Sequence, residues 1–586
     1  MVFNKTLKRC AGVPPALAVA LAVLTFGPAS QIEALAQTSP SKVEPGQLEK
    51  SLSAPDKVGE PKLAPKPAQT EIPKSITPGG AEAITFVLKG LSVEGSGVYK
   101  SGVLSGLAKE KFGNQVSVAD IFRIADKMTA RYRNDGYLLT TVVVPPQKID
   151  DGKVVLKVVE GFVDRVVVEG LPKHHQAKIK RYLKKVVGKR PLKSSTLERY
   201  LLLVDDLPGI DVQSFMQPST DNGGAATLTV KPKMKRLSGW ATANNRGREV
   251  IGPYQMTLGV RVNTLAHLGQ SLTGQVVTTP EDHDELKHVN MSFGQELGTE
   301  GTTVILSASA MLSEPGEELE ALELESQSMG FDLMLRTKPF RSRGANLFFS
   351  ITGSVREAET EALDADLSED RSRAVKLSAE LQTLDSTGAT SLAFDANRGI
   401  DLLGATQDGS TLLSRGDAKA EATWFGLRLS RAQRLSRVAG LHLSARGQYS
   451  MDALSASREF AVGGEANASA FDASEILGDH GVSGRLELRV TPGLSGLLAS
   501  EKRKDWVRAS GLQLIAFGDG GYVWQKSSSA ALGQQDARIA SAGIGARFNA
   551  GSYVSGSIEA AMPFLKTVES QGNRDPRVFF RLSARF

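Results

Sequence analysis

Alternation of apolar and polar residues constrains this chain more than any other feature of its sequence. The terminal run RVFFRLSARF, residues 577–586, places Arg and Ser on one face of a strand and apolar side chains on the other. The apolar face consists of Val578, Phe580, Leu582, Ala584 and Phe586. A strand that crosses a membrane barrel needs about 9 to 11 residues, with lipid on one side and a wet lumen on the other. The run fits that requirement, although a half-buried strand of a soluble sheet would alternate in the same way.

The same alternation continues through residues 236–586. Further runs include YQMTLGVRVNTL, TTVILSASAML, SMGFDLMLRT, HLSARGQYSM, ASAGIGARFNA and SYVSGSIEAAM, whose second faces carry Gly, Ser and Arg. After the amino terminus no segment approaches about 18 consecutive apolar residues, so a membrane-spanning chain of this kind must close into a barrel. At roughly 22 residues per strand with its connection, the region predicts about 16 strands around an aqueous or plugged lumen.

The predicted connections alternate in length, as they do in outer-membrane barrels. Short turns such as KPFRSRGAN alternate with long acidic stretches, SEPGEELEALELES and REAETEALDADLSEDRSR. We interpret the acidic stretches as solvated external loops, with divalent-cation bridging to anionic lipid as the alternative. Phe586 would end the strand that pairs with the first one to close the barrel. We therefore assign Phe580, Leu582 and Phe586 to a terminal assembly strand.

The amino terminus has the parts of a secretory signal. Lys5, Lys8 and Arg9 precede the apolar run AGVPPALAVALAVLTF, and ALAQ then offers small residues for cleavage. We predict a signal peptide over residues 1–36; a retained anchor is the alternative, but the run is short and contains two prolines. The single cysteine, Cys10, precedes the apolar run, so the mature chain would hold neither a disulfide nor a cysteine-ligated metal. The formal charge of +6 is modest for 586 residues and does not indicate a nucleic-acid partner.

Residues 37–82 hold eight prolines among Ser, Lys, Glu and Gln, and cannot bury a core. We expect them to form an extended, Pro-rich linker. Within it GQLEKSLSA, residues 46–54, could form a short helix that is stable only when it docks. Such a helix could plug the resting pore and leave when a client arrives.

Two α/β modules follow the linker. In the first, residues 83–161, the strand AITFVLKGLSVEG precedes two helical stretches and the strands YLLTTVVVPP and KVVLKVVEG. Ser117 and Asp120 form a helix-start capping pattern. In the second, residues 162–235, FVDRVVVEG precedes helices around HHQAKIKRYLKKVV and STLERYLLLVDDLPG and strands around VQSFMQ and ATLTVKP. The predicted fold class is therefore α+β: two β-α-α-β-β modules followed by a transmembrane antiparallel β-barrel of about 16 strands over residues 236–586.

Several of these stretches resemble the outer-membrane transporters of two-partner secretion, the hemolysin secretion/activation family. The first module's RYRNDGYLLTTVVVPPQKIDDGKVVLKVVEG is similar to the family's Tyr-x-x-x-Gly-Tyr, Pro-x-Gln and Val-x-Glu-Gly pattern. In the second module, LLLVDDLPGI is similar to the family's Leu-Pro-Gly segment. The resemblance implies two POTRA domains in the periplasm of a Gram-negative bacterium and a barrel in its outer membrane. The same superfamily contains the barrel-assembly insertase.

In the barrel, REFAVGGEANASAFDASEILGDHGVSGRLELRV resembles the loop-six region that folds back into the lumen. We assign to this region the site residues Gly463, Gly464, Ser469, Ala470 and Phe471. The family has Val-Arg-Gly-Tyr or Val-Arg-Gly-Phe where this chain has Ala-Ser-Ala-Phe. Only the aromatic residue is kept, which puts the loop-locking contact in question.

The family's strand motif Phe-x-Asp-x-Gly is intact as Phe517, Asp519 and Gly521. The resemblance implies that the loop arginine pairs with this aspartate, and Ser469 stands where that arginine would be. An unpaired carboxylate is costly when it is desolvated. We therefore expect another arginine, with Arg485 as the candidate, to take its place.

The resemblance implies a transporter that captures an unfolded exoprotein through its POTRA domains and secretes it through the barrel. A module with an exposed sheet edge can bind a client by strand addition. The alternatives are an outer-membrane insertase or assembly factor, and a passive porin or receptor barrel. The expected partners are the exoprotein client, outer-membrane lipid, and the barrel-assembly machinery and periplasmic chaperones during biogenesis, with no nucleic acid.

The sequence does not predict an enzyme. It has no phosphate-binding loop, no Gly-x-Ser-x-Gly elbow and no His-Glu-x-x-His motif. His283 and His288 lack the spacing of a helical zinc pair. We therefore assign no catalytic, cofactor-binding or metal-binding residue and expect no cofactor.

Overall fold

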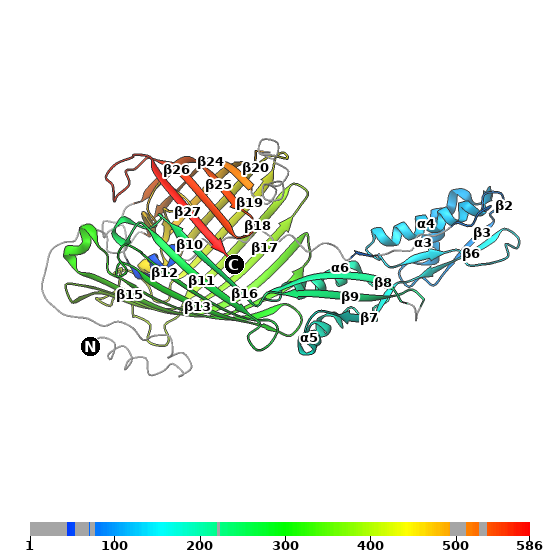
Figure 1. The fold of residues 1–586 in the computed structure, drawn as a ribbon, viewed down its shortest axis with the longest axis horizontal. Coiled ribbons are helices and arrows are strands. Elements are labelled where there is room, and N and C mark those ends of the chain that lie inside the picture. Colours follow the sequence, from blue (N-terminus) through cyan, green and yellow to red (C-terminus); the bar gives the residue numbers. More distant parts are fainter. Residues whose placement is uncertain (1–43, 53–68, 71–76, 220–222, 493–510, 527–535) are drawn as a thin grey trace.

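A computed structural model describes residues 44–52, 69–70, 77–219, 223–492, 511–526 and 536–586. The predicted signal peptide lies outside these residues. A large barrel forms one end of the molecule, and the two modules project from it one after the other (Figure 1). Among the described residues, no helix combines the length and the apolar character that a membrane span requires.

The barrel is a single closed sheet of sixteen strands, as the alternation predicted. Each strand pairs antiparallel with its two neighbours in the barrel. The strands follow one another around the barrel in chain order. Its strands are β10 (Leu237–Asn244), β11 (Gln255–Asn263), β12 (Gln270–Thr278), β13 (Lys287–Leu297), β14 (Thr302–Ser313), β15 (Leu324–Arg341), β16 (Ala345–Ala362), β17 (Ala365–Leu384), β18 (Gly388–Gly399), β19 (Thr423–Arg434), β20 (Ala439–Ser450), β23 (His480–Val490), β24 (Gly511–Trp524), β25 (Ala537–Ala550), β26 (Val554–Phe564) and β27 (Arg577–Arg585).

The last strand closes the barrel against the first. β27 pairs with β10 from Trp240 opposite Arg585 to Asn244 opposite Arg581. Beyond this register, Gly239 and Phe586 exchange two backbone hydrogen bonds of 3.0 Å. A Cβ atom at Gly239 would lie only 2.1 Å from the Phe586 ring, so the terminal ring packs where the first strand has no side chain. Phe586 is therefore part of the closing seam.

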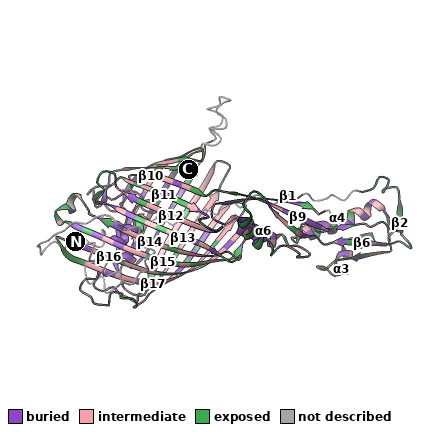
Figure 2. Ribbon diagram, turned by 60° about the horizontal axis from the view of Figure 1, so that its bottom comes forward, coloured by how far each residue is buried: buried purple, intermediate pink, exposed green. Residues whose placement is uncertain are grey.

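The two faces of the barrel wall differ as the sequence pattern predicted. Exposed and less exposed residues alternate along the strands (Figure 2). Outward positions hold large apolar side chains that remain exposed, including Leu258, Val260, Leu333, Leu377, Phe394, Leu427, Leu486, Ile544, Ile558 and Leu582. A band of this kind is the surface that barrel strands present to lipid.

One of the acidic stretches was assigned wrongly. Residues 356–373 were expected to form an external loop, but they belong to the hairpin of β16 and β17, which turns at Leu363 and Asp364. These strands have 18 and 20 residues, whereas about 9 to 11 suffice to cross a bilayer. The parts of these strands that extend beyond the bilayer need no lipid-facing side, so they lack the apolar alternation that marks a membrane-crossing strand. The other acidic stretch contains the 3₁₀ helix η5 (Glu317–Leu322) before β15 begins.

The first module contains more strands than the pattern indicated. Its elements are β2 (Thr85–Val87), β3 (Gly90–Glu94), α3 (Ser101–Ser105), the 3₁₀ helix η3 (Gly106–Lys111), β4 (Gln115–Ser117), α4 (Val118–Asn134), β5 (Thr141–Val143) and β6 (Lys153–Val159). The predicted first strand divides because Leu88 N–H donates to Asn114 O while Lys89 N–H donates to Gly152 O. β2 thus pairs with β4, whereas β3 joins the sheet β3-β6-β5. The capping box of Ser117 and Asp120 at the start of α4 is confirmed.

The second module has the predicted order of elements. It comprises β7 (Phe162–Val168), α5 (Lys173–Leu183), α6 (Ser194–Asp205), β8 (Ile210–Pro218) and β9 (Ala225–Met234). β7 pairs parallel with β9, and β8 pairs antiparallel with β9. Both helices bury apolar faces against this sheet, with Ile179, Tyr182, Leu183, Leu203 and Val204 at the centre of the core.

Two short pieces of the predicted linker are placed by the structure. The helix α2 (Pro45–Leu52) lies inside the barrel, where it contacts β14, β15 and β16 (blue in Figure 1). The two-residue strand β1 (Gln69–Thr70) lies outside the barrel and adds to the sheet of the second module. The proline-rich chain therefore connects the lumen to the modules.

Candidate functional site

A long connection between β20 and β23 folds into the lumen. We call these residues, 451–479, loop six. They contain the 3₁₀ helix η6 (Ala456–Arg458) and a small hairpin of β21 (Phe460–Val462) and β22 (Ile476–Gly478). The loop is buried against inward side chains of four wall strands, in a cluster of Phe460, Val462, Ala468, Ala470, Phe471, Ile476, Ile515, Phe517, Ile539, Ala561 and Phe579.

Two of the predicted loop residues turn the chain at the tip. Gly463 and Gly464 have φ values of 127° and 89°, a region that glycine enters without steric cost. A Cβ atom at Gly463 would lie 2.1 Å from Asp472 O on the returning chain. This close approach brings Ser469, Ala470 and Phe471 back toward the wall, where all three are buried.

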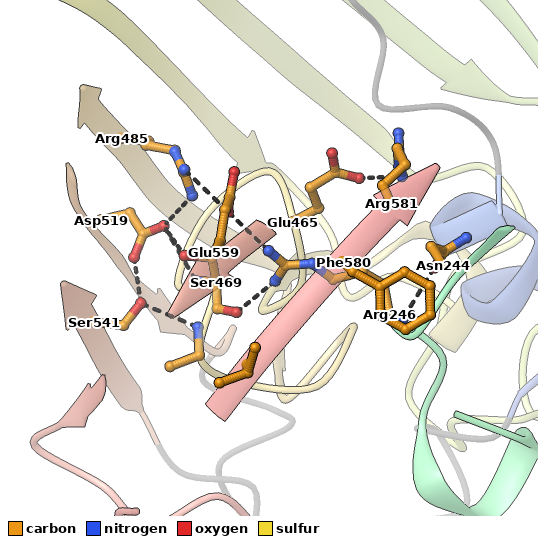
Figure 3. Close-up of polar contacts among 12 residues, drawn as sticks. Asn244, Arg246, Glu465, Ser469, Arg485, Asp519, Ser541, Glu559, Phe580 and Arg581 are labelled. Atoms are coloured by element: carbon orange, nitrogen blue, oxygen red, sulfur yellow. Dashed lines mark hydrogen bonds and ion pairs between the residues drawn. The ribbon is translucent and has the colours of Figure 1, made fainter. Parts of the chain in front are cut away.

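Asp519 on β24 receives the tip of loop six (Figure 3). Its Oδ2 accepts hydrogen bonds from Ser469 N–H at 3.1 Å and from Ser469 Oγ at 2.7 Å. Arg485 Nη1 donates to the same oxygen at 3.0 Å, and Ser541 Oγ donates to Oδ1. The expected substitute is confirmed: Arg485, on the neighbouring strand β23, pairs with the carboxylate that the loop leaves without an arginine.

The cation at Arg485 is itself held on several sides. Its guanidinium lies 3.7 Å from the centre of the Phe517 ring, on the motif strand. Its Nη2 is 3.1 Å from Glu487 and 3.4 Å from Glu559. Three carboxylates therefore share this buried arginine, and Arg547 supplies a second positive charge to Glu487 at 2.6 Å.

A second arginine at the loop tip was not predicted. Arg246 lies in the turn after β10, donates from Nη1 to Ser469 O at 2.7 Å, and pairs through Nη2 with Glu559 at 2.8 Å (Figure 3). Its guanidinium lies 3.8 Å from the centre of the Phe579 ring. Ser469 is thus held through its carbonyl on the Arg246 side and through its N–H and hydroxyl on the Asp519 side. A residue in a turn has no periodicity, so the sequence offered no signal for this contact.

The third motif residue, Gly521, provides space for the loop hairpin. A Cβ atom there would lie 2.7 Å from Val462 Cγ1 and 2.8 Å from Val482 O. Only a residue without a side chain lets β21 lie this close to β24. The intact motif therefore supplies an aromatic ring for Arg485, a carboxylate for Ser469 and a gap for Val462.

The helix α2 is the second segment inside the lumen. Leu48 is buried in an apolar cluster with Val250, Ile251, Val277, Leu286, Met311, Leu319 and Leu324. On another side of the helix, Glu49 Oε1 accepts a hydrogen bond from Ser309 Oγ at 2.7 Å and lies 3.4 Å from Arg356 Nη2. The short helix docks on the wall, as its sequence required for stability.

The helix α2 and loop six also touch each other. Gln47 Nε2 donates to the carbonyls of Ala456 and Glu459, and Lys50 Nζ donates to Glu459 O at 3.1 Å. A Cβ atom at Gly46 would lie 2.5 Å from Ser457 Cβ, so the helix approaches η6 at the one position where it has no side chain. The two lumenal segments form one continuous obstruction.

The predicted assembly residues lie on the outer face of the terminal strand. Phe580, Leu582 and Phe586 are 39%, 49% and 62% exposed, so they face the surroundings of the barrel and not the lumen. Phe580 N–H donates to Asn245 Oδ1 at 2.7 Å, a side-chain bond across the closing seam. None of the three contacts the loop-six site.

The second module is fixed to the barrel through the end of α6. Asp206 pairs with Arg341 at 2.8 Å and with Lys338 at 3.2 Å, both on β15. Burial would raise the pKa of the Asp206 carboxyl, but the hydrogen bonds and positive charges of Arg341 and Lys338 outweigh it and lower this pKa. Nearby, Tyr200 Oη donates to Glu300 in the turn between β13 and β14 at 3.0 Å.

Carboxylates that could meet a cation gather at one place among the described residues. Glu359, Glu361 and Asp366 offer oxygens within 4.8 Å of one another on the hairpin of β16 and β17. They belong to the acidic stretch discussed above. Exposed acidic groups of this kind commonly hold no ion, and no role is assigned to them.

The fold and the lumen define the class of this protein. It is an outer-membrane β-barrel with POTRA domains in the periplasm. The profile described as the ShlB-type POTRA domain matches residues 86–161, and the profile described as haemolysin secretion/activation protein ShlB/FhaC/HecB matches residues 225–548. Because the second match covers more than half of the chain, the protein belongs to the haemolysin secretion/activation protein family.

Individual relatives are more distant. The heme/hemopexin transporter protein HuxB of Haemophilus influenzae is 23% identical over 248 residues, which are 41% of this chain and 43% of HuxB. The match therefore spans less than half of that relative's length.

Solved structures share the fold over most of the chain. CdiB from Escherichia coli is 19% identical, with a TM-score of 0.70 over 95% of this chain and 100% of that one. CdiB from Acinetobacter baumannii is 15% identical, with a TM-score of 0.61 over 89% and 95%. BamA from Haemophilus ducreyi, lacking POTRA domains 1–3, is 13% identical, with a TM-score of 0.51 over 86% and 100%.

Proposed function

We propose that this protein is the outer-membrane transporter of a two-partner secretion system. It would capture an unfolded exoprotein in the periplasm through its POTRA domains and pass it through the barrel lumen. Family membership supports this function, because members of the family are transporters. The observation that carries the proposal is the lumen itself, which is closed by α2 and loop six and not by the side chains of the wall alone.

The physical argument concerns what the route needs. A barrel of sixteen strands encloses a lumen wide enough for an extended polypeptide once inserted segments move aside. The helix α2 is a separate, short segment held by few polar contacts, so its departure costs no strand of the wall. Folding of the client outside would then bias its movement. The proposal assigns no catalytic residue and no cofactor.

We assign different roles to the three groups of predicted site residues. Gly463, Gly464, Ser469, Ala470 and Phe471 would hold loop six against the wall, and Phe517, Asp519 and Gly521 would receive it, with Arg485 in place of the loop arginine. Phe580, Leu582 and Phe586 would present the terminal strand to the barrel-assembly machinery. Periplasmic chaperones and outer-membrane lipid are the further partners of this step.

The test is secretion itself. The chain is expressed together with a candidate client, a large exported protein of the same bacterium, and the medium is assayed for that client with the intact chain and with residues 83–235 deleted. We expect client in the medium only when both modules are present. The inserted barrel is measured in parallel by its heat-modifiable mobility in gels, so that loss of secretion is not confused with loss of the protein.

Two outcomes would contradict the proposal. Depletion of other barrel proteins from the outer membrane on loss of this chain, without any effect on the client, would indicate an insertase. A passive porin would be indicated if solutes passed freely through the intact protein and the amount of client in the medium were the same with the intact chain, without the chain, and with residues 83–235 deleted.

A further inference from the structure

The segments inside the lumen carry carboxylates where the barrel wall carries arginines. Three ion pairs join them, one from α2 and two from loop six; the pair at Arg581 is drawn in Figure 3. The pairs are Glu49 with Arg356 at 3.4 Å, Asp472 with Arg577 at 2.9 Å, and Glu465 with Arg581. In each pair the acid belongs to the inserted segment and the guanidinium to the wall. The wall therefore holds polypeptide in its lumen partly by binding carboxylates.

Arginines continue along the wall from these pairs toward the periplasm. They occupy inward positions of β11, β23, β25 and β27, where they alternate with outward apolar residues such as Val260 and Leu488. Each lies near the end of a strand that runs toward the POTRA domains. We call these four residues the arginine wall: Arg261, Arg489, Arg547 and Arg585.

The strands across the lumen have a different charge pattern. In the order of the barrel, β15 to β17 lie opposite β25 to β27. There the charges of the two signs are matched, since Arg336 Nη2 on β15 lies 2.8 Å from Glu380 on β17. The lumen is therefore asymmetric, with its positive side on the strands that end in the closing seam.

The carboxylate nearest to the arginine wall is already shared. Glu487 lies 2.7 Å from Arg489, 2.6 Å from Arg547 and 3.1 Å from Arg485. One negative charge thus serves three guanidinium groups. The side chains of Arg489 and Arg547 remain 22% and 32% exposed, so both can still meet a further anion in the lumen.

Arg261 and Arg585 lie on either side of Trp240 beside the closing seam. Trp240 stands opposite Arg585 on β27 and opposite Gly259 on β11, and Arg261 is the next inward residue after Gly259. A Cβ atom at Gly259 would lie 2.1 Å from Trp240 Cζ2, so the indole ring covers this glycine. Both arginines are exposed, and within the described parts of the chain neither pairs with a carboxylate side chain. Two cations beside an apolar ring therefore line the periplasmic end of the lumen.

We propose that the arginine wall is an entry surface for acidic segments of the client. An extended segment that carries Asp or Glu would pass along Arg261 and Arg585 and then along Arg489 and Arg547, and would finally replace the carboxylates of α2 and loop six. The inference rests on the proposed transport function and names a chemical class for the client: an unfolded polypeptide with carboxylate-rich segments.

The charge of a confined lumen favours this class of client. Charges of one sign that line a narrow passage raise the local concentration of the opposite ion. Contacts with partly exposed arginines are individually weak, so a segment can move from one guanidinium to the next without being trapped. A segment rich in Lys or Arg would be repelled at the same positions.

Ion selectivity tests the charge of the wall without a client. The full-length protein is placed in planar bilayers across a KCl gradient, and the reversal potential of its openings gives the ratio of chloride to potassium permeability. We expect chloride to permeate severalfold better, and Arg261→Gln/Arg585→Gln to lower this ratio. The control Lys109→Gln/Lys127→Gln removes two charges from the exposed surface of the first POTRA domain and should leave the ratio unchanged. A preference for potassium in the native channel would overturn the proposal.

Peptide binding tests the preference for carboxylates directly. The probes are two fluorescent, unstructured Gly/Ser peptides of equal length, one with evenly spaced Glu and one with Lys at the same positions. We expect the purified full-length protein to bind the Glu peptide severalfold more tightly at low salt, with the difference disappearing at high salt because exposed charges are screened. Arg261→Gln/Arg585→Gln should weaken binding of the Glu peptide, and the control pair Lys109→Gln/Lys127→Gln should not. Equal binding of the two peptides to the native protein would overturn the arginine wall.

Secretion separates this inference from the proposed function. Arg261→Glu/Arg585→Glu reverses both charges and should lower the amount of client in the medium severalfold, while heat-modifiable mobility reports the inserted barrel. If this variant fails to insert, Arg261→Gln/Arg585→Gln takes its place, with a smaller expected loss. Native levels of secretion by an inserted charge variant would overturn the arginine wall and leave the transporter standing. A native chain that secretes no client would contradict the proposed function itself, whatever the peptides show.

Discussion

Two segments close the same lumen, and they are held there by different means. Loop six is continuous with β20 and β23 and is fastened by an apolar cluster and by charged groups at both sides of its tip. The plug helix α2 belongs to a linker and is held by Leu48 and a small number of polar contacts. This difference indicates that α2 is the part of the obstruction that can leave the lumen. Removing α2 leaves every wall strand in place, whereas removing loop six would expose the buried charged groups that hold it.

The largest expected effect comes from removing the weakly held segment. Deleting residues 37–82 should raise single-channel conductance in planar bilayers severalfold, because α2 no longer fills the lumen beside β14 to β16. Replacing only residues 45–52 by a Gly/Ser sequence of equal length is the control that keeps the tether, and it should raise the conductance as well. Unchanged conductance in both variants would mean that loop six alone closes the pore.

The next effect concerns the strongly held segment. Arg485→Met keeps an unbranched apolar stem but leaves Asp519 and Glu559 without this charge partner, so the barrel should lose about 3 kcal/mol of stability, as for a broken buried ion pair. The measurement is the urea midpoint of the heat-modifiable band. Arg398→Met breaks an exposed pair with Glu421 and should cost less than about 1 kcal/mol. Equal midpoints for the two variants would contradict the anchoring role of Arg485.

The contact between the two segments can be loosened without removing either. Gly46→Val places a branched side chain where Ser457 Cβ would lie 2.5 Å away, so α2 should shift from loop six and the pore should open more often, with a smaller gain than the deletion gives. The control is Gly102→Val, since a Cβ at Gly102 in α3 meets nothing within 4 Å. Open probability in planar bilayers is the readout, and a value equal to that of the control would show that this contact does not hold the plug.

The smallest expected effect concerns the contact between the second POTRA domain and the barrel, where Asp206 pairs with Lys338 and Arg341. We call this contact the joint; it lies outside the lumen and involves neither α2 nor loop six. Because folding lowers the pKa of Asp206, its contribution to stability is fully present above about pH 4, where the unfolded-state carboxyl is ionised. That contribution is lost as the pH falls through the lower folded value. We expect the joint to loosen in this range by about 1 kcal/mol, seen as a broader distance distribution between spin labels on α6 and the barrel.

Asp206→Asn should make that distribution broad at every pH, while Asp211→Asn, on the exposed face of β8, should leave the acid response unchanged. An acid response that persists in the Asp206→Asn protein would assign the joint to other groups.

The sequence by itself determined the architecture. Alternation along β11, and along β27 apart from the inward Phe579, predicted the outer and inner faces, because a lipid-facing strand presents apolar side chains at every second position. The Ser117 and Asp120 capping pair marked the start of α4, since both partners lie within one helical turn. Local sequence patterns also predicted the two modules and the strand, ending near Phe586, that closes the barrel. The acidic hairpin of β16 and β17 was missed because its strands leave the membrane, where alternation is no longer required.

Only the tertiary structure decided the contacts inside the lumen. The sequence made Arg485 a candidate partner for Asp519, but it gave no sign that Arg246, from a turn more than two hundred residues away, would hold Ser469 from the other side. Nor could it place α2 against Ser309 and η6, or lay Gln69 beside Phe215. Periodicity indicates which face of a helix or strand is polar and which is apolar, because residues at a fixed spacing meet the same environment. A contact between a loop and a distant wall strand occurs once, and only the closed barrel brings its two partners together.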